Sequence, residues 1–426
     1  MNPAEPRRDG TRAIISGAGM LSVAMLLANI GNYALNIFLG RVLTPAEFSD
    51  ANLMVTLMLT ATAVALGLEM VTARYTSVAE AGGNPGAADL VARRLRWWTG
   101  GAGVVAAVAL IAPAPLWSDL FQTASAWPFV VLGLGLPFYL QQAIGRGVMQ
   151  GRLRFGLLAS TFVIEMVTRL SVAIALVAAG WGVVGATIGL SASFIVTWVS
   201  VTVLARASGE RADPAIPMSE VGRYGAFVSV LLAAQMIANN SDVLVSKAVL
   251  APDDAGTYAA VALVGRAVFY LAWSVATVVF PVVARRHAGG DDSGGILRGS
   301  ILVISAMGGL CALGALWLGG PVLGIVIGPA YADLSVPLAA YALATTLFAV
   351  ANLVASVALS TGVLRPSVFV LGGALAQLML LLIWHDDIAQ LILVQIIAMS
   401  ALVAAMAIDA AVRRPTSARH DEGAAA

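Results

Sequence analysis

Apolar stretches long enough to cross a lipid bilayer dominate this 426-residue chain and leave few folds open to it. A membrane-spanning helix needs about 20 predominantly apolar residues. Only 11% of the residues are charged, against roughly 25% in soluble domains. The sequence therefore predicts an all-α polytopic membrane protein, with spans at 13–40, 47–72, 97–117, 127–148, 156–179, 182–205, 223–249, 256–284, 298–320, 334–358, 366–385 and 388–411.

Prolines mark the third and fourth spans, where we expect bent helices because neighbouring helices can satisfy the backbone groups that a kink frees. They are Pro113, Pro115, Pro128 and Pro137. The first span follows basic residues as in a signal peptide. It is longer than a signal sequence and lacks an evident cleavage site, so we expect a retained helix.

The basic residues predict the orientation of these spans. With the N-terminus inside, the exterior carries only Arg41 and Lys247, and Arg169 and Arg266 lie within spans. The other basic residues fall in cytoplasmic segments: Arg7, Arg8, Arg12, Arg74, Arg93, Arg94, Arg96, Arg146, Arg152, Arg154, Arg206, Arg211, Arg223, Arg285, Arg286, Arg298, Arg365, Arg413, Arg414 and Arg419. Because cytoplasmic loops carry the excess of Lys and Arg, both termini are predicted to be cytoplasmic.

The two halves of the chain repeat each other weakly. Asn32, Val42, Leu43 and Pro45 recur as Asn239, Val249, Leu250 and Pro252, and Ala73-Arg74 recurs as Ala284-Arg285. Each predicted half has an even number of spans, so the halves should share one membrane orientation and face each other across a central cleft. The predicted organisation is a six-helix bundle at 1–205, a cytoplasmic linker at 206–222, a second six-helix bundle at 223–412 and a cytoplasmic tail at 413–426.

Several function classes find no support in the sequence. The basic residues are spread over many loops, so no nucleic-acid-binding patch is predicted. The only lysine, Lys247, follows Ser246, which excludes a Walker phosphate-binding loop. The three histidines fall outside the spans, at His287, His385 and His420, and the only cysteine, Cys311, lies in an apolar run. We therefore expect no metal site, no cofactor and no disulfide, and a transporter rather than an enzyme.

Ionisable and polar residues inside predicted spans are the candidate site, because a charge at the centre of a membrane helix costs about 2.5–3.5 kcal/mol and needs a partner or a wet cavity. Glu165 and Arg169 are four residues apart on one helix face, which favours an ion pair. A purely structural pair is the alternative. Polar stripes follow two further spans, with Asn29, Asn32 and Asn36 on one and Gln235, Asn239, Asp242 and Ser246 on the other. They predict a cleft lining, or alternatively hydrogen bonds between helices.

The eighth predicted span presents Arg266, Tyr270, Trp273 and Thr277 on one face. An arginine beside aromatic rings suits a phosphate and sugar rings, since a guanidinium binds phosphate through two parallel hydrogen bonds. The alternative is an arginine that extends outward along a lipid-facing aromatic pair. Glu69 and Asp242 are candidates for proton or cation coupling, Glu69 also being a candidate interfacial acid.

Motifs near the N-terminus resemble a known family. Gly40-Arg41-Val42-Leu43-Thr44-Pro45-Ala46-Glu47-Phe48, Gly67-Leu68-Glu69 and Ala73-Arg74-Tyr75 are similar to the opening of polysaccharide flippases in the multidrug/oligosaccharidyl-lipid/polysaccharide (MOP) exporter superfamily. Met149-Gln150-Gly151 through Phe155, Asn239 through Lys247 and Ile327-Gly328-Pro329-Ala330-Tyr331 extend the likeness over most of the chain.

This resemblance implies a flippase of the bacterial cytoplasmic membrane that translocates a polyprenyl-diphosphate-linked oligosaccharide by alternating access. It would be driven by an ion or substrate gradient, and glycan-assembly proteins are implied partners. Arg266, Tyr270, Trp273, Arg169, Asn32, Asn36 and Asn239 are then expected to bind substrate, and Asp242, Glu165 and Glu69 to act as coupling or counter-ion groups. A multidrug exporter of the same superfamily is one alternative, and a membrane glycosyltransferase or glycan ligase is another.

Overall fold

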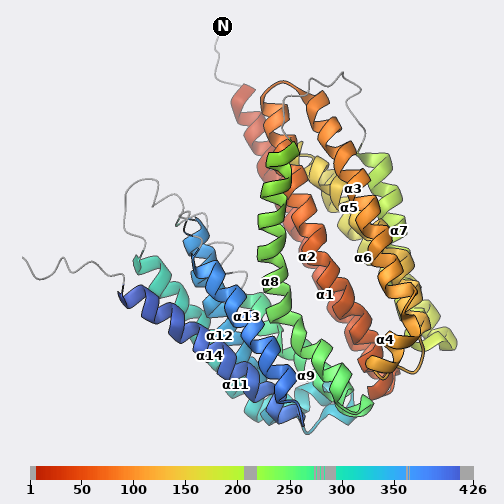
Figure 1. The fold of residues 1–426 in the computed structure, drawn as a ribbon, viewed down its shortest axis with the longest axis vertical. Helices are drawn as coiled ribbons and strands as arrows, with labels where there is room; N and C mark the ends of the chain where they lie inside the picture. Colours follow the sequence, from red (N-terminus) through yellow and green to blue (C-terminus); the bar gives the residue numbers. More distant parts are fainter. Residues whose placement is uncertain are drawn as a thin grey trace, which may run out of the picture. The chain divides into compact units, whose positions relative to one another are not determined.

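The structure is a computed structural model that describes residues 6–205, 218–272, 275, 279, 283, 294–360, 363 and 365–412. Helices account for nearly all of these residues, and no strand occurs among them. The helices of the first half are α1 (Pro6–Val42), α2 (Pro45–Ala81), α3 (Pro85–Ile111), α4 (Ala114–Leu120), α5 (Trp127–Gly151), α6 (Phe155–Leu176), the π-helical turn η1 (Val177–Trp181) and α7 (Gly182–Leu204) (Figure 1).

The helices of the second half are α8 (Met218–Val249), α9 (Pro252–Gly265), α11 (Gly294–Val326), the 3-10 turn η2 (Pro329–Tyr331), α12 (Ser335–Ser360), α13 (Arg365–Ile383) and α14 (Ile388–Val412). Every predicted span contains helix, which confirms the all-α membrane class. Part of the predicted span 256–284 and most of the predicted linker 206–222 lie outside the described residues.

Nine helical stretches of the described residues are long and apolar enough to cross a membrane, or ten when the bent pair α3 and α4 counts as one span. One of the nine, Phe155–Leu204, holds two predicted spans. Its chain turns back at Gly180 and Gly182, whose positive φ angles of 89° and 49° glycine adopts readily, so α6 and α7 pack against each other. The predicted bend at Pro113 is confirmed, since α3 and α4 meet there at 59°.

The chain forms two compact units. Unit 1 comprises Met1–Ala260 and Gly324–Tyr331, and unit 2 comprises Val261–Leu323 and Ala332–Ala426. Unit 1 thus contains the first seven helices together with α8 and most of α9. The predicted division into bundles at 1–205 and 223–412 stays a prediction.

Within unit 1, α5 is the central helix, because it packs against α2, α3 and α7, and α2 packs in turn against α8. Small residues allow the close approach of α5 and α2. A side chain at Gly147 or Gly151 would collide with the backbone carbonyls of Glu69 or Ala73. The core beside this contact is apolar and fully enclosed, with Leu53, Met54, Phe129, Leu132 and Phe194. Large apolar side chains also cover much of the outer surface, as expected where lipid is the solvent.

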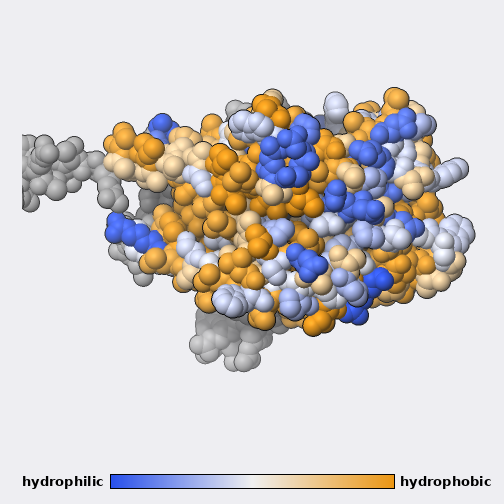
Figure 2. Space-filling view, turned by 90° about the horizontal axis from the view of Figure 1, so that it is seen from below, coloured by the Kyte–Doolittle hydropathy of each residue, from blue (hydrophilic) through white to orange (hydrophobic). Residues whose placement is uncertain are grey.

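The start of α2 shows how local sequence ends one helix and begins the next. Thr44 and Glu47 form a capping box, in which the Thr44 side chain accepts from the Glu47 backbone and Glu47 accepts from the Thr44 backbone. Pro45 occupies the first turn, where its missing N–H is not needed. Seen from the end of the molecule at which α2 begins, hydrophilic residues form groups among hydrophobic ones (Figure 2).

Candidate functional site

Two polar stripes from neighbouring helices build a buried site in unit 1. On α6, Thr161, Glu165 and Arg169 step by four residues and therefore share one helix face. On α5, Gln142 and Arg146 are also four residues apart. All five side chains are buried, although both helices are otherwise largely apolar. The stripes face each other, so charged groups that lipid would reject are paired inside the protein.

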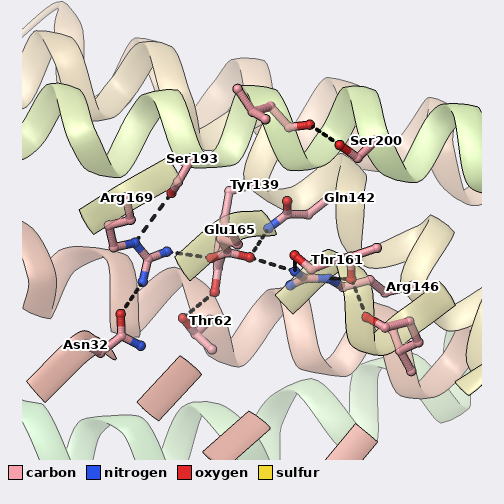
Figure 3. A network of polar contacts seen from close by, with 12 residues as sticks. Asn32, Thr62, Tyr139, Gln142, Arg146, Thr161, Glu165, Arg169, Ser193 and Ser200 are labelled. Carbon is pink, nitrogen blue, oxygen red and sulfur yellow. Dashed lines mark hydrogen bonds and ion pairs between the residues drawn. The ribbon is translucent and has the colours of Figure 1, made fainter. Parts of the chain in front are cut away.

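Glu165 links the two arginines (Figure 3). One carboxylate oxygen accepts from Nη2 of Arg146 at 2.7 Å, and the other accepts from Nη2 of Arg169 at 2.5 Å. Gln142 donates to the same oxygen as Arg146, at 3.3 Å. Both oxygens of this carboxylate are therefore occupied by cationic donors, which offsets the high cost of burying its charge.

Each guanidinium is also held by contacts that do not involve Glu165. Arg146 donates from Nε to the hydroxyl of Thr161 at 3.1 Å, and its guanidinium carbon lies 4.1 Å from the centre of the Phe162 ring. Arg169 donates from Nη1 to the side-chain oxygen of Asn32 on α1 at 2.8 Å and from Nε to Ser193 on α7 at 3.4 Å. Helices α1, α5, α6 and α7 thus all fix this cluster.

The cluster forms one wall of a cavity of about 210 Å³ that lies wholly in unit 1. Arg146, Glu165 and Arg169 line it, together with residues that include Asn29, Asn32, Thr62, Glu69, Tyr139, Gln142 and Phe162. The hydroxyls of Thr62 and Tyr139, two of the lining residues, are 2.7 Å apart. The cavity is therefore both polar and aromatic, in a helical unit whose outer surface is largely apolar.

Two acceptor groups at this cavity have unused hydrogen-bonding capacity. The carboxyl of Glu69 makes no hydrogen bond with another described residue. The side-chain oxygen of Gln142 is buried and accepts no hydrogen bond within the described chain. Buried polar atoms such as the Gln142 oxygen are normally satisfied. The Gln142 oxygen is therefore suited to a polar ligand, and the half-buried carboxyl of Glu69 to a polar ligand or an exchangeable proton.

Several predicted site residues meet at this cavity, and others lie elsewhere. Arg169, Glu165, Glu69 and Asn32 all line it. The buried Asn36 instead donates to the backbone oxygen of Asn32 at 2.8 Å. On α8, Asn239 is half-buried, and Asp242 is buried and accepts from the hydroxyl of Tyr258 at 2.9 Å. None of these three side chains lines the cavity.

The predicted group on the eighth span belongs to unit 2. Arg266 is buried there and donates from Nε to the hydroxyl of Tyr341 at 3.1 Å. Tyr270 is exposed, and Trp273 lies outside the described residues. A second cavity, of about 300 Å³, lies in the same unit between Gly265 and Leu338, but apolar side chains and Cys311 line it, so it offers no partner to a phosphate.

Two basic residues that the sequence analysis assigns to segments outside the membrane are buried in the structure. Arg146 counts among the cytoplasmic residues in the sequence, yet it is only 6% exposed, because α5 continues to Gly151 and turns this side chain towards Glu165. Lys247 counts as exterior, yet it is 2% exposed and forms an ion pair with Asp50. Basic residues near helix ends are assigned to water by sequence reasoning, and only the tertiary partner reveals otherwise. In the sequence, only the spacing of four between Gln142 and Arg146 indicates that one face of α5 is polar.

No group of three or more His, Cys, Asp or Glu side chains that could hold a metal ion occurs among the described residues. The expectation that no metal is bound stays a prediction for the chain as a whole.

Comparisons with known proteins agree with this architecture. The chain matches the family described as polysaccharide biosynthesis protein over residues 14–287. No curated protein sequence matches it. Similar solved structures include an inward-facing multidrug resistance MATE family transporter of the MOP superfamily, with a TM-score of 0.75, 14% identity and coverage of 94% of this chain and 100% of the other.

Lipid II flippase MurJ in an inward closed conformation is similar with a TM-score of 0.74 and 13% identity over 92% of this chain and 87% of its own. A MOP superfamily transporter from Pyrococcus furiosus is similar with a TM-score of 0.60 and 16% identity, over 94% of this chain and 96% of its own. At such identities the likeness to these structures concerns the fold alone. Since the family match spans well over half of its length, the chain belongs to the polysaccharide biosynthesis protein family, with the fold of MOP superfamily transporters and flippases.

Proposed function

We propose that the protein is a flippase that moves a polyprenyl-diphosphate-linked oligosaccharide from the cytoplasmic to the outer leaflet of the bacterial cytoplasmic membrane. The observation that carries the proposal is the cavity wall formed by Arg146, Glu165 and Arg169. Two guanidinium groups share one carboxylate there, so the wall keeps an excess of cationic N–H donors. Guanidinium forks match phosphate oxygens and bind them bidentately.

The diphosphate would compete with Glu165 for the two arginines as the site loads. The polar groups around it, the amides of Asn32 and Gln142 among them, would take hydroxyls of the first sugar. A cavity of about 210 Å³ suits the diphosphate and adjoining groups rather than a whole glycan. The prenyl tail would stay in lipid, and the two predicted six-helix bundles would rock in alternating access, as in other transporters built from repeats.

A coupling role is proposed for Glu69, because this carboxyl lines the same cavity as the arginines. A proton or cation bound there would change the charge that the substrate meets. Asp242 remains the second proposed coupling residue. In the second half, Arg266 is a proposed phosphate ligand, with Tyr270, Trp273 and Asn239 beside the path.

The same proposal includes the orientation of the chain. Both termini and the segment 206–222 would be cytoplasmic, because nearly all basic residues outside the spans then face inward. Proteins that assemble the glycan are the proposed partners. No covalent bond is made or broken in this function, so a transporter needs no catalytic residue.

A multidrug exporter is the second candidate, favoured by the structural similarity to a multidrug resistance MATE family transporter. The cavity separates the two candidates by charge. A site for cationic drugs should present several carboxylates to its ligand, whereas here Glu165 is bonded to two arginines and Glu69 alone is left to a cation. An anionic substrate fits that wall better.

The decisive experiment is reconstitution into proteoliposomes with a fluorescent polyprenyl-diphosphate-linked sugar, whose appearance in the opposite leaflet is measured by a membrane-impermeant quencher. Arg169→Ala should abolish flipping, while the remaining Arg146–Glu165 pair keeps the charges balanced and the fold intact. Arg169→Lys should rescue poorly, because the bidentate fork is lost. The matched control is Arg365→Ala, since Arg365 lies outside the cavity and its side chain is 55% exposed.

Extrusion of cationic dyes is measured with the same vesicles. Dye export by the wild type without flipping of the glycolipid would overturn the proposal in favour of the drug exporter. Flipping at the wild-type rate by Arg169→Ala would remove the cavity from the mechanism.

A further inference from the structure

One end of unit 1 joins residues from both halves of the sequence. It is the end at which α1 finishes and α2 begins (Figure 1). Arg41, the penultimate residue of α1, donates from Nε to the carbonyl of Val326 at 3.0 Å and from Nη2 to that of Ile325. These are the last carbonyls of α11, which a cation at a helix C-terminus satisfies and stabilises.

Two glycines allow close packing between the two halves of the sequence at this end. A side chain on Gly40 would overlap Ile327, and one on Gly256 would overlap the carbonyl of Pro45. The ring of Phe48 packs edge-on against that of Tyr331, with centroids 6.2 Å apart. Because Pro45 and Pro252 are equivalent positions of the internal repeat, the first turns of equivalent helices meet here.

A buried ion pair lies beside this contact. Nζ of Lys247 on α8 is 2.6 Å from a carboxylate oxygen of Asp50 on α2, and the two side chains are 2% and 6% exposed. Lys247 also donates to the hydroxyl of Ser49 at 2.8 Å and to the carbonyl of Gln122 at 3.5 Å. Asp50 accepts from the backbone N–H of Ala124 at 3.1 Å. The pair therefore ties α2, α8 and the loop after α4 together.

The charges at this contact affect the free energy that opening it would cost. A wholly apolar seal would hold the end closed through the free energy of burying its surface. A buried ion pair gives little net stabilisation, because desolvation of its two charges nearly offsets their attraction. When water enters, both groups regain hydration, so the closed dry state and the open wet state can lie close in free energy. Such a balance is what a two-state element of a transporter needs.

We propose that Lys247 and Asp50 form the latch of a gate that closes this end of the transport path, the end predicted to face outward. Closed, the latch holds α8 against α2. Open, it exposes the ammonium of Lys247 to water. The latch concerns the movement of the protein and holds whether the cargo is a glycolipid or a drug.

Lys247 is the only lysine in the chain, so a water-soluble amine-reactive reagent reports on the latch without any engineered probe. Mass spectrometry separates its peptide from the N-terminal amine. The wild type in proteoliposomes should react slowly. Asp50→Asn should speed the labelling by about tenfold, the change given by a shift of about 1.4 kcal/mol in the opening equilibrium. Ser49→Ala is the matched control, since it removes a hydrogen bond to Lys247 and keeps the ion pair.

Charge reversal separates a latch from a merely structural pair. Asp50→Lys places two cations together and should hold the end open, whereas Asp50→Lys combined with Lys247→Asp should restore closure and transport. The amine introduced at position 50 is present in both variants, so its labelling rate is the readout that compares them. Equal reactivity of this amine in the single and double variants would overturn the latch.

Cross-linking tests whether the latch must open. Asp50→Cys and Lys247→Cys are introduced together with Cys311→Ala, which removes the only native thiol. A short, reducible bis-thiosulfonate should join the two cysteines and stop transport, and a reductant should restore it. Transport by the cross-linked protein at the uncross-linked rate would show that this end is not a gate. Because labelling does not depend on the cargo, failure of the flippase proposal would leave the labelling result unchanged.

Discussion

At the scale of single residues, Glu165 governs the charge balance of the cavity. Both of its oxygens are bonded to arginines, and the three charged side chains are about one-tenth exposed or less. Removing one member of a buried ion pair costs about 3–5 kcal/mol, because the remaining charge is left buried without compensation. Here two guanidinium groups would lose their shared partner at once.

Glu165→Gln should therefore lower the melting temperature of the purified protein in detergent far more than Arg365→Gln does. Arg365 pairs with Asp409 at 3.1 Å, but its side chain is 55% exposed, and exposed pairs contribute about 0–1 kcal/mol. Thermal unfolding of the two variants beside the wild type makes the comparison. Equal shifts would mean that the cavity pair is as well hydrated as the surface pair.

Tyr331 gives the opposite prediction. Its hydroxyl is buried and makes no hydrogen bond within the described chain. Since an unsatisfied buried polar group costs about 1–3 kcal/mol, Tyr331→Phe should raise the melting temperature. Tyr341→Phe is the control that should lower it, because the Tyr341 hydroxyl accepts from Arg266. A lower melting temperature for Tyr331→Phe would contradict the argument.

The same tyrosine predicts a pH dependence. Burial, and secondarily the charge of Asp253, raises the pKa of Tyr331 to about 12 from its ordinary value of 10.0. The folded state therefore keeps the proton that the unfolded chain releases. The resulting contribution to stability is complete below pH 10 and is lost as pH rises from 10 to 12. The alkaline loss of melting temperature should be smaller in Tyr331→Phe than in the wild type.

Side-chain contacts could be predicted from the sequence where both partners lie on the same helix. The spacing of Glu165 and Arg169 on one helix face predicts their ion pair, and the structure contains it. The burial of Arg146 and Lys247 was not predicted, because their partners Glu165 and Asp50 lie on other helices. A position near a helix end carries no information about such a partner.

At the scale of helices, the contact between α5 and α2 depends on the absence of side chains. A Cβ on Gly147 would lie 2.6 Å from the carbonyl oxygen of Glu69 and from Cβ of Thr72. Glycines four residues apart, as at Gly147 and Gly151, allow this close approach in membrane helices. Arg146 directly precedes Gly147 on α5, so the contact between α5 and α2 also helps to fix the position of the Arg146 guanidinium.

Gly147→Leu should separate α5 from α2, costing about 1–3 kcal/mol or more through overpacking, and should reduce transport by displacing Arg146. Gly101→Leu is the matched control, because Gly101 is exposed on α3 with no neighbouring atom near its missing Cβ. Folded yield and melting temperature are measured for both. A Gly147→Leu protein as stable as the control would mean that α5 and α2 need not touch.

Helix positions were predictable from the sequence because the length of an apolar run is a local property. Helix occurs in every predicted span, and the bend at Pro113 was expected from the proline itself. The assignment of α8 to the same compact unit as α2 was not predictable, since it follows from contacts such as Lys247 with Asp50 rather than from chain order.

At the scale of the whole molecule, the orientation in the membrane is the testable quantity. Reporters that are active only outside the cytoplasm, fused at residue 213 and at the two termini, should all be inactive. A fusion at residue 251, between α8 and α9, should be active. Activity at residue 213 would reverse the predicted orientation and place the ion pair of Lys247 and Asp50 at the cytoplasmic end.

Unit 1 takes α8 and most of α9 from the second half of the sequence, and this has a consequence for dividing the gene. A fragment ending at residue 217 would lack α8, so Asp50 on α2 would face the membrane without its partner Lys247. Fragments ending at 217 and starting at 218 should therefore be degraded when produced singly and should protect each other when produced in one cell. The two halves of this protein would behave as obligate partners, joined through α2 and α8 even without a continuous chain.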